Sequence, residues 1–173
     1  MDITEKINSS KIVAEAYLLA FNAHSGQKRK SGENYFMHPL QVAVIAIDNN
    51  ADDAIVAASL LHDVVEDTVI TLDEIRSKFG EEVCFLVDGV TKEKSDEGTF
   101  NKIRMYSQKD KRVLFVKLAD RIHNMQTPID SDEWKKKYCS STKEFYIPMA
   151  REYGFENFAD RLENLLGKLK NAE

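Results

Sequence analysis

The stretch AIVAASLLHDVVEDT, residues 54–68, decides how this chain folds. Up to Val65, only Ser59, His62 and Asp63 interrupt its apolar residues, so it reads as a helix packed inside the protein. Aspartate is almost never buried unless it is paired or bound to a cation. Either this helix is exposed, or something positively charged is buried with it.

The first half of the chain reads as helices joined by turns. Only 7 Gly and 3 Pro occur among the 173 residues, which favours long helices over many short strands. Asp2 or Thr4 is expected to cap a helix that ends near SGQKRKSG (25–32), and Pro39 suits the first turn of the next helix. NNADD (49–53) supplies a turn and an N-cap for the helix that contains the opening stretch.

The second half continues this pattern. Thr71 and Glu74 form a capping box for a helix that Gly80 closes. Next we expect a helix over 81–90, a charged loop over 91–99, an apolar helix from Lys111 to Met125, an acidic turn over 128–132, a helical segment interrupted by Pro148, and a last helix from about Phe155 to Leu169. The sequence therefore predicts an all-α fold, a single helical bundle over residues 1–173.

The composition limits the classes of function. The net charge of −5 argues against a protein that binds nucleic-acid polymers, although a few local cations or a metal can still attract a small anion. Cys84 and Cys139 lie in no CxxC pattern and are expected to be reduced thiols. No secretory signal and no apolar run of about 18 residues is visible, so we expect a cytoplasmic protein without a membrane partner. The oligomeric state is not indicated.

A second stretch, VLFVKLADRIHNM (113–125), carries polar residues on an apolar helix. Lys117, Asp120, Arg121 and Asn124 fall at i, i+3, i+4 and i+7, which forms one continuous stripe. A helix this apolar is expected to pack on several sides, so its polar stripe should face a cavity. A carboxylate between two cations also suits a plain salt bridge.

Together the two helices suggest a metal site. His62, Asp63 and Asp120 can converge on one centre, and His38 can supply a fourth ligand. Such a mixed set of imidazole and carboxylate suits Mn²⁺, Fe²⁺ or Zn²⁺. Alternatively, His62 and Asp63 are simply the polar edge of an amphipathic helix.

Three segments resemble a known family. AHSGQKRKSGENYFMHPLQVA (23–43), LLHDVVEDT (60–68) and VKLADRIHNMQT (116–127) resemble the HD-domain hydrolases of the RelA/SpoT family, in the family's order. These enzymes cleave the alarmone guanosine 3′,5′-bis(diphosphate), ppGpp. The resemblance covers about residues 20–150. It implies an HD-type helical bundle with a buried metal site, and a small, hydrolase-only member, because longer members continue into a synthetase domain.

The resemblance also implies a reaction. The 3′-diphosphate would be removed from ppGpp or pppGpp, giving GDP or GTP and pyrophosphate. One Mn²⁺ would be bound by the four residues His38, His62, Asp63 and Asp120. Glu66 and Asp67 match the family's catalytic pair, which positions and deprotonates water or protonates the leaving oxygen. The sequence does not assign these two roles between them.

Further matches imply contacts with the nucleotide. The residues concerned are Arg29, Lys30, Ser31, Lys117, Arg121, Asn124, Thr127 and Tyr146. Arg121 is alternatively a partner that braces Asp120, and Tyr146 alternatively a partly buried aromatic. Lys28 is expected to be solvated, Trp134 to pack, and His24 and His123 to be structural.

The sequence is also compatible with two other functions. The same site would suit another nucleotide phosphorylated at the 2′ or 3′ position, such as NADPH. A catalytically silent alarmone-binding module is the third reading, although such a module would not need both Glu66 and Asp67. The region 92–109 matches the family poorly, so substrate preference and regulation are not indicated.

Overall fold

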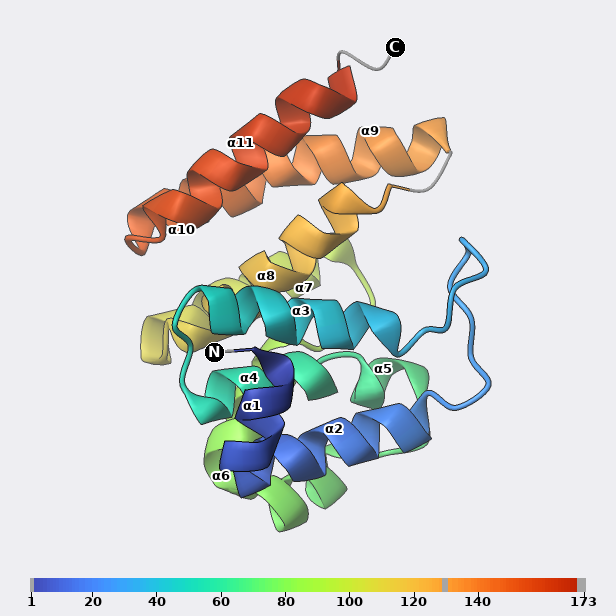
Figure 1. Ribbon diagram of the computed structural model, residues 1–173. Coiled ribbons are helices and arrows are strands. Elements are labelled where there is room, and N and C mark those ends of the chain that lie inside the picture. Colours follow the sequence, from blue (N-terminus) through green and yellow to red (C-terminus); the bar gives the residue numbers. More distant parts are fainter. Residues whose placement is uncertain (1, 129–130, 171–173) are drawn as a thin grey trace.

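The computed structural model describes residues 2–128 and 131–170. Within these ranges the regular elements are helices, apart from one isolated bridge between Lys28 and Asn34. The prediction of an all-α fold is confirmed (Figure 1). No helix among the described residues is both long enough and apolar enough to cross a membrane.

The helices follow one another with short connections. The first six are α1 (Ile3–Ser9), α2 (Lys11–Ala23), α3 (Met37–Asp48), α4 (Asp53–Leu61), α5 (Val64–Asp67) and α6 (Leu72–Val90). They are followed by α7 (Asp96–Lys109), α8 (Arg112–Gln126), α9 (Asp132–Ser141), a π-helical turn η1 (Thr142–Tyr146), α10 (Ile147–Glu152) and α11 (Glu156–Lys170).

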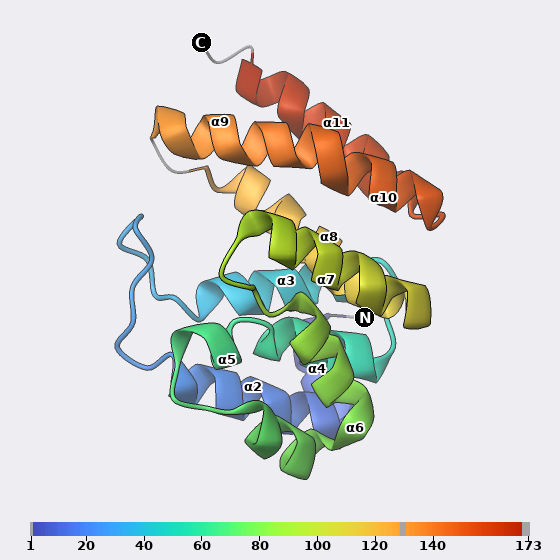
Figure 2. The same ribbon diagram turned by 180° about the vertical axis from the view of Figure 1, so that it is seen from behind.

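Helix α8 is the centre of the arrangement. It packs against α3, α4, α6 and α7 on one side and against α10 and α11 on the other. Figures 1 and 2 show α9, α10 and α11 forming a layer above α8, with α2 to α6 below it. Almost every residue of α8 is buried, including Lys117, Asp120 and Arg121. The prediction that this helix packs on several sides is therefore correct, and its polar stripe is enclosed.

Two predicted helices are interrupted. The first breaks at Ser10, whose φ of −130° and ψ of 113° are extended, so that α1 and α2 are separate. The cap of α1 is Asp2, in a capping box with Glu5. The helix of the opening stretch ends at Leu61 and resumes at Val64. His62 and Asp63 form the connection and keep right-handed helical backbone angles of φ −60°, ψ −31° and φ −100°, ψ −6°.

Other boundaries follow local chemistry. The capping box of Thr71 with Glu74 is present, and Gly80, at φ 83° and ψ 174°, kinks the chain where the helix was predicted to close. The charged loop is shorter than predicted, because the Ser95 side chain accepts a hydrogen bond from the Gly98 backbone and starts α7 at Asp96. The predicted acidic turn over 128–132 lies partly outside the described residues.

Gly89 permits close packing of three helices. A Cβ at this position in α6 would lie 2.8 Å from the side chains of both Tyr106 in α7 and Val113 in α8. We expect Gly89→Ala to lower the free energy of unfolding by about 1–3 kcal/mol, the usual effect of overpacking. Urea denaturation measures this, with Gly167→Ala as the control, because open space surrounds Gly167. Equal stability of the Gly89 variant and the parent would contradict the packing described.

Candidate active site

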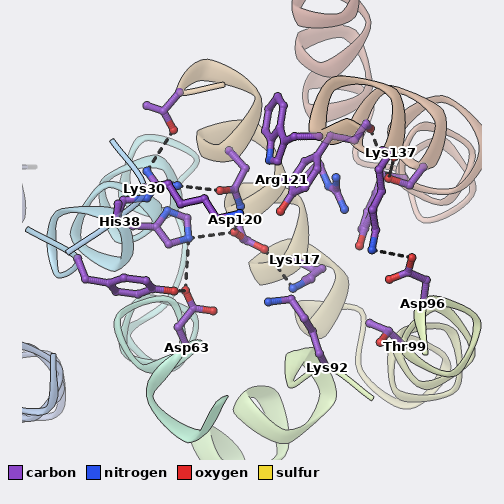
Figure 3. A pocket seen from close by; sticks show the side chains of 18 of the residues that line it. Lys30, His38, Asp63, Lys92, Asp96, Thr99, Lys117, Asp120, Arg121 and Lys137 are labelled. Carbon is purple, nitrogen blue, oxygen red and sulfur yellow. Dashed lines mark hydrogen bonds and ion pairs between the residues drawn. The ribbon is translucent and has the colours of Figure 1, made fainter. Parts of the chain in front are cut away.

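Three helical segments bring four candidate metal ligands together. His38 lies in the first turn of α3, His62 and Asp63 lie between α4 and α5, and Asp120 lies in α8. His38 Nε2 is 3.2 Å from His62 Nε2 and 3.1 Å from Asp120 Oδ1, while Asp63 Oδ2 is 3.2 Å from His62 Nε2. All four are buried, and Figure 3 marks the contacts of His38 with Asp63 and Asp120. His38, His62 and Asp120 each place a ligand atom within 4.8 Å of the others. Asp63 contacts the two histidines, with its Oδ2 3.5 Å from His38 Nε2 and 3.2 Å from His62 Nε2, but it does not belong to this three-residue group.

Hydrogen bonds behind the histidines orient their rings. His62 Nδ1 lies 2.8 Å from the backbone oxygen of Ser59, which only accepts, so Nδ1 carries the proton and a neutral ring leaves Nε2 bare. His38 Nδ1 lies 2.7 Å from His123 Nδ1. Burial, and then the nearby His38, lower the pKa of His123 to about 4, so His123 is neutral and can accept. Both Nε2 atoms can therefore face a cation, the usual effect of such supporting bonds.

The electrostatics of the cluster also favour a cation. Burial alone would raise the pKa of Asp63 and of Asp120, but nearby positive charges, chiefly His62 and Lys117 respectively, hold both below their ordinary value. Burial lowers the pKa of His62, yet the charges of Asp63 and Asp120 outweigh burial and raise it to about 9. The proton that His62 carries lies near both carboxylates, since its Nε2 is 3.2 Å from Asp63 Oδ2 and 3.7 Å from Asp120 Oδ1. A divalent cation that displaced this proton would satisfy the same charges, so the donor set fits a metal ion.

These residues open onto a cavity of about 430 Å³. All eight side chains predicted to contact the nucleotide line it, together with His38, Asp63 and Asp120. The other lining residues include Lys28, Tyr35, Lys92, Phe100, Trp134, Lys137 and Tyr138. An acidic protein thus concentrates basic and aromatic side chains around one hollow, which suits an anion that carries a ring system.

Arg29 connects the 28–34 loop to α8. Its Nη2 donates to Asn124 Oδ1 at 3.0 Å, and its Nη1 donates to Thr127 Oγ1 at 3.2 Å. Asn124 Nδ2 in turn donates to Asp120 Oδ1 at 2.5 Å. Arg29, Asn124 and Thr127, three of the residues predicted to contact the nucleotide, therefore lie together, and the Asn124 amide connects them to the candidate metal ligand Asp120.

Glu66 and Asp67 lie one turn beyond His62 and Asp63, and neither lines the cavity. Asp67 is aligned with Asp63 as predicted, because its backbone nitrogen donates to the Asp63 oxygen at 2.9 Å and both carboxylates contact the Tyr35 hydroxyl. Glu66 instead accepts from the backbone nitrogen of Lys92 at 2.6 Å and from Lys92 Nζ at 2.8 Å. Asp67 Oδ2 accepts from the Tyr35 hydroxyl at 2.5 Å. Each carboxylate therefore holds a residue that lines the cavity.

Two lysines lie beside the candidate ligands. Lys117 Nζ is 3.1 Å from Asp120 Oδ2 and is almost fully buried, and Lys92 points toward it in Figure 3. Burial lowers the pKa of both lysines, but the carboxylates around them raise both above the ordinary value. Both ammonium groups are therefore charged. Sequence reasoning missed Lys92, which lies in a charged loop and is held at the site by two hydrogen bonds to Glu66 in α5.

Arg121 is sandwiched between two aromatic rings. Its guanidinium carbon lies 4.4 Å from the ring centre of Tyr138 and 4.1 Å from that of Tyr146. The residue is 8% exposed, and within the described residues its Nη1 has no hydrogen-bond partner. The described contacts of Arg121 are thus with the two rings and not with Asp120. A buried guanidinium with an unused donor is costly unless an anion joins it.

Four other residues were predicted to have structural or solvent-exposed roles, and two of them also line the cavity. His24 is fully buried and His123 supports His38, as predicted for structural residues. Trp134, expected to pack only, also lines the cavity while it stacks on Tyr138 at 4.4 Å between ring centres. Lys28 is exposed, as predicted, yet it too lines the cavity. No local pattern could have revealed these positions, because they depend on α9 and the 28–34 loop lining the same cavity.

A family model described as the HD domain matches residues 16–156, most of the chain. The chain belongs to the HD-domain family. The matched range includes His38, His62, Asp63 and Asp120, and the match supports the predicted HD-type helical bundle. One domain over the full range 1–173 stays a prediction.

The relatives of this HD domain are named as a guanosine-3′,5′-bis(diphosphate) 3′-pyrophosphohydrolase and as GTP pyrophosphokinases. It is 40% identical over 165 residues to a probable guanosine-3′,5′-bis(diphosphate) 3′-pyrophosphohydrolase of Synechocystis sp., covering 89% of this chain and 22% of that protein. It is 42% identical over 170 residues to a GTP pyrophosphokinase of Streptomyces coelicolor, covering 92% and 20% respectively. The HD domain thus spans about a fifth of the length of these curated relatives.

A solved structure resembles nearly the whole HD domain. It is described as a metazoan ortholog of SpoT that hydrolyses ppGpp and plays a role in starvation responses. It matches with a TM-score of 0.78 and 26% sequence identity, and the match covers 92% of this chain and 96% of that one. The resemblance to the RelA/SpoT group is therefore found in sequence and in fold.

Proposed function

We propose that this HD domain removes the 3′-diphosphate from ppGpp or pppGpp, giving GDP or GTP and pyrophosphate. The observation that carries the proposal is a candidate metal group that opens onto a cavity lined by cations. The names of the Synechocystis relative and of the metazoan structure support the choice of substrate. The hydrolase-only type and the cytoplasmic location stay predictions, as do the absence of nucleic-acid and membrane partners.

In this proposal His38, His62, Asp63 and Asp120 hold one Mn²⁺. The mixture of imidazole and carboxylate donors supports a transition metal, and manganese is the member that the family resemblance implies. When bound, the ion supplies a Lewis acid that neutralises phosphate charge and lowers the pKa of water. Asp63 and Asp120 are expected to stay ionised, because their pKa values lie below the ordinary range.

The protein's own residues bind and orient the substrate. Lys92 and Lys117 lie beside the candidate ligands, so we assign them to the 3′-diphosphate. Arg29, Asn124 and Thr127 form the nucleoside end. Water attacks the phosphorus bonded to the ribose 3′-oxygen, that P–O bond breaks, and the oxygen leaves with a proton. Glu66 and Asp67 accept and return protons in this proposal, through adjustments of the side chains that now bond Lys92 and Tyr35.

A product assay tests the proposed function. Purified protein is incubated with Mn²⁺ and ppGpp, pppGpp, GTP, NADPH or a cyclic dinucleotide, and products are identified by chromatography. GDP and pyrophosphate from ppGpp support the proposal. Preferential loss of the 2′-phosphate of NADPH would replace it, and ppGpp binding without turnover would favour a sensor.

Arg29 provides a prediction about base recognition. An arginine can stack on a purine and bond to its edge. We expect Arg29→Ala to raise KM for ppGpp by about 10–100-fold, the range of hydrogen bonds to charged groups, and to reduce discrimination between guanine and adenine nucleotides. Lys30→Ala should instead weaken all phosphorylated nucleotides alike and flatten the salt dependence. If Arg29→Ala changes neither KM nor base preference, the base binds elsewhere.

Arg121 provides a prediction about phosphate recognition. Its unused Nη1 and its burial suggest that a phosphate oxygen completes its bonding. We expect Arg121→Gln to raise KM for ppGpp by about 10–100-fold, because a charged hydrogen bond is lost. Arg104→Gln is the control, since this exposed arginine also stacks on a ring, that of Phe145, but does not line the cavity. Equal effects of the two substitutions would contradict the assignment.

A further inference from the structure

Two residues close the base of the 28–34 loop, which carries Arg29, Lys30 and Ser31. The backbone nitrogen of Tyr35 donates to the backbone oxygen of Gln27 at 3.0 Å, and the bridge between Lys28 and Asn34 follows directly. Gln27 and Tyr35 therefore fix where the nucleotide-contacting loop leaves the helical bundle.

The same two residues reach Asp67. Gln27 Nε2 donates to the backbone oxygen of Asp67 at 2.8 Å. The Tyr35 hydroxyl lies 2.5 Å from Asp67 Oδ2 and 2.9 Å from Asp63 Oδ2. A phenol has one proton, and the shorter distance identifies Asp67 as its main acceptor. Asp67 is exposed, so these two bonds, together with its own backbone bond to Asp63, restrict where its carboxylate points.

His24 contacts both Gln27 and Tyr35. It is fully buried, its Nδ1 lies 2.8 Å from Gln27 Oε1, and in the described part of the chain its Nε2 has no partner. A buried unpaired donor is the costlier arrangement, so Nδ1 carries the proton and donates to Gln27. The amide NH₂ of Gln27 is then free to face Asp67. The His24 ring also stacks on Tyr35, with 4.8 Å between ring centres and an interplanar angle of 24°.

We propose that Tyr35 is a positioning residue for Asp67, and that Gln27 and His24 hold the base of the loop so that the nucleotide-contacting loop and this carboxylate keep one geometry. Tyr35 belongs to the loop base, so a nucleotide that pulls on Arg29 also acts on the partner of Asp67. The catalytic consequence rests on the proposed hydrolysis. The hydrogen bond between Tyr35 and Asp67 does not depend on that proposal.

The first test is Tyr35→Phe, which removes the hydroxyl and keeps the ring on His24. We expect kcat for ppGpp to fall about 100-fold, the usual effect of a slightly misplaced catalytic group, with KM and Mn²⁺ affinity unchanged. Tyr106→Phe is the matched control, because the Tyr106 hydroxyl donates to Asp88 at 2.6 Å outside this cavity. That control should keep full activity. Weaker Mn²⁺ binding by Tyr35→Phe would mean that Tyr35 acts on Asp63 and would overturn the proposal.

A double variant separates positioning from general damage. If Tyr35 acts through Asp67, adding Tyr35→Phe to Asp67→Asn should cause no further loss of kcat. Losses that multiply would overturn the proposal. Gln27→Met, which keeps the size of the side chain and removes both of its hydrogen bonds, should lower kcat in the same way as Tyr35→Phe.

A measurement without turnover tests the contact if the proposed function fails. Hydrogen–deuterium exchange of the intact protein with Mn²⁺ should become faster over residues 64–68 in Tyr35→Phe and Gln27→Met, and stay unchanged in Tyr106→Phe. Absence of pyrophosphate release by the parent protein would reject only the hydrolysis. Unchanged exchange over residues 64–68 in both variants would reject the positioning role.

Discussion

Loss of one candidate ligand should abolish both metal binding and hydrolysis. We expect His62→Ala and Asp63→Asn to lose Mn²⁺ and to reduce kcat by ~1,000-fold or more, because a metal supplies several kcal/mol to such a reaction. Removing a ligand also leaves buried carboxylates less compensated, so the metal-loaded His62→Ala protein should melt at a lower temperature than the parent. Isothermal titration with Mn²⁺, pyrophosphate release and thermal melting measure the three effects.

Chelation provides the complementary measurement. Removal of the metal should stop turnover, and Mn²⁺ should restore it better than Mg²⁺ does, because the site offers two imidazole nitrogens. Asp53→Asn is a suitable control for Asp63→Asn, because Asp53 begins α4 and pairs with Lys6 away from the cavity. Full activity of a metal-free sample would rule out the metal site as the catalytic centre.

The second large effect concerns Glu66 and Asp67. We expect Glu66→Gln and Asp67→Asn to keep Mn²⁺ and ppGpp binding and to lose about two to four orders of magnitude in kcat, the range for general acid–base catalysis. Single-turnover kinetics with ppGpp measure the chemical step. Loss of metal in these variants equal to that in Asp63→Asn would contradict the division between ligands and catalytic carboxylates.

Glu66 needs one further variant, because it accepts two hydrogen bonds from Lys92. Lys92→Met removes only the ammonium and should raise KM more than it lowers kcat, as expected for a residue that binds phosphate. If Lys92→Met instead reproduces the whole loss of kcat seen with Glu66→Gln, the role of Glu66 is to hold Lys92. Glu93→Gln serves as the control, since Glu93 pairs with Lys102 outside this cavity.

The sequence was most informative where the pattern is local. The stripe of Lys117, Asp120, Arg121 and Asn124 follows from helical spacing alone, and all four side chains line the cavity. Caps are local too: the capping box at Thr71 is present, and Gly80, where a helix was predicted to close, kinks the chain within α6. The breaks at Ser10 and after Leu61 carry no Gly or Pro signal.

The rest of the site depends on tertiary structure. Lys92 and Tyr35 contact Glu66 and Asp67 across 26 and 32 positions of sequence. Neither residue sits in a spacing pattern that would reveal such a contact. The partner of Glu66 is Lys92, which donates to it through both its backbone nitrogen and its Nζ. Composition and periodicity could therefore identify which helices contribute to the site, but could not show how the connecting loops complete it.

One side-chain amide joins the two halves of the cavity. Asn124 accepts from Arg29 through Oδ1 and donates to Asp120 through Nδ2. Any ligand that reorients this amide from the nucleoside end changes the bonding of a candidate metal ligand, and the reverse also holds. Such a coupling free energy is reciprocal: the factor by which the ion strengthens nucleotide binding equals the factor by which the nucleotide strengthens ion binding. A bound nucleotide therefore changes the affinity for the ion, and a bound ion changes the affinity for the nucleotide by the same factor.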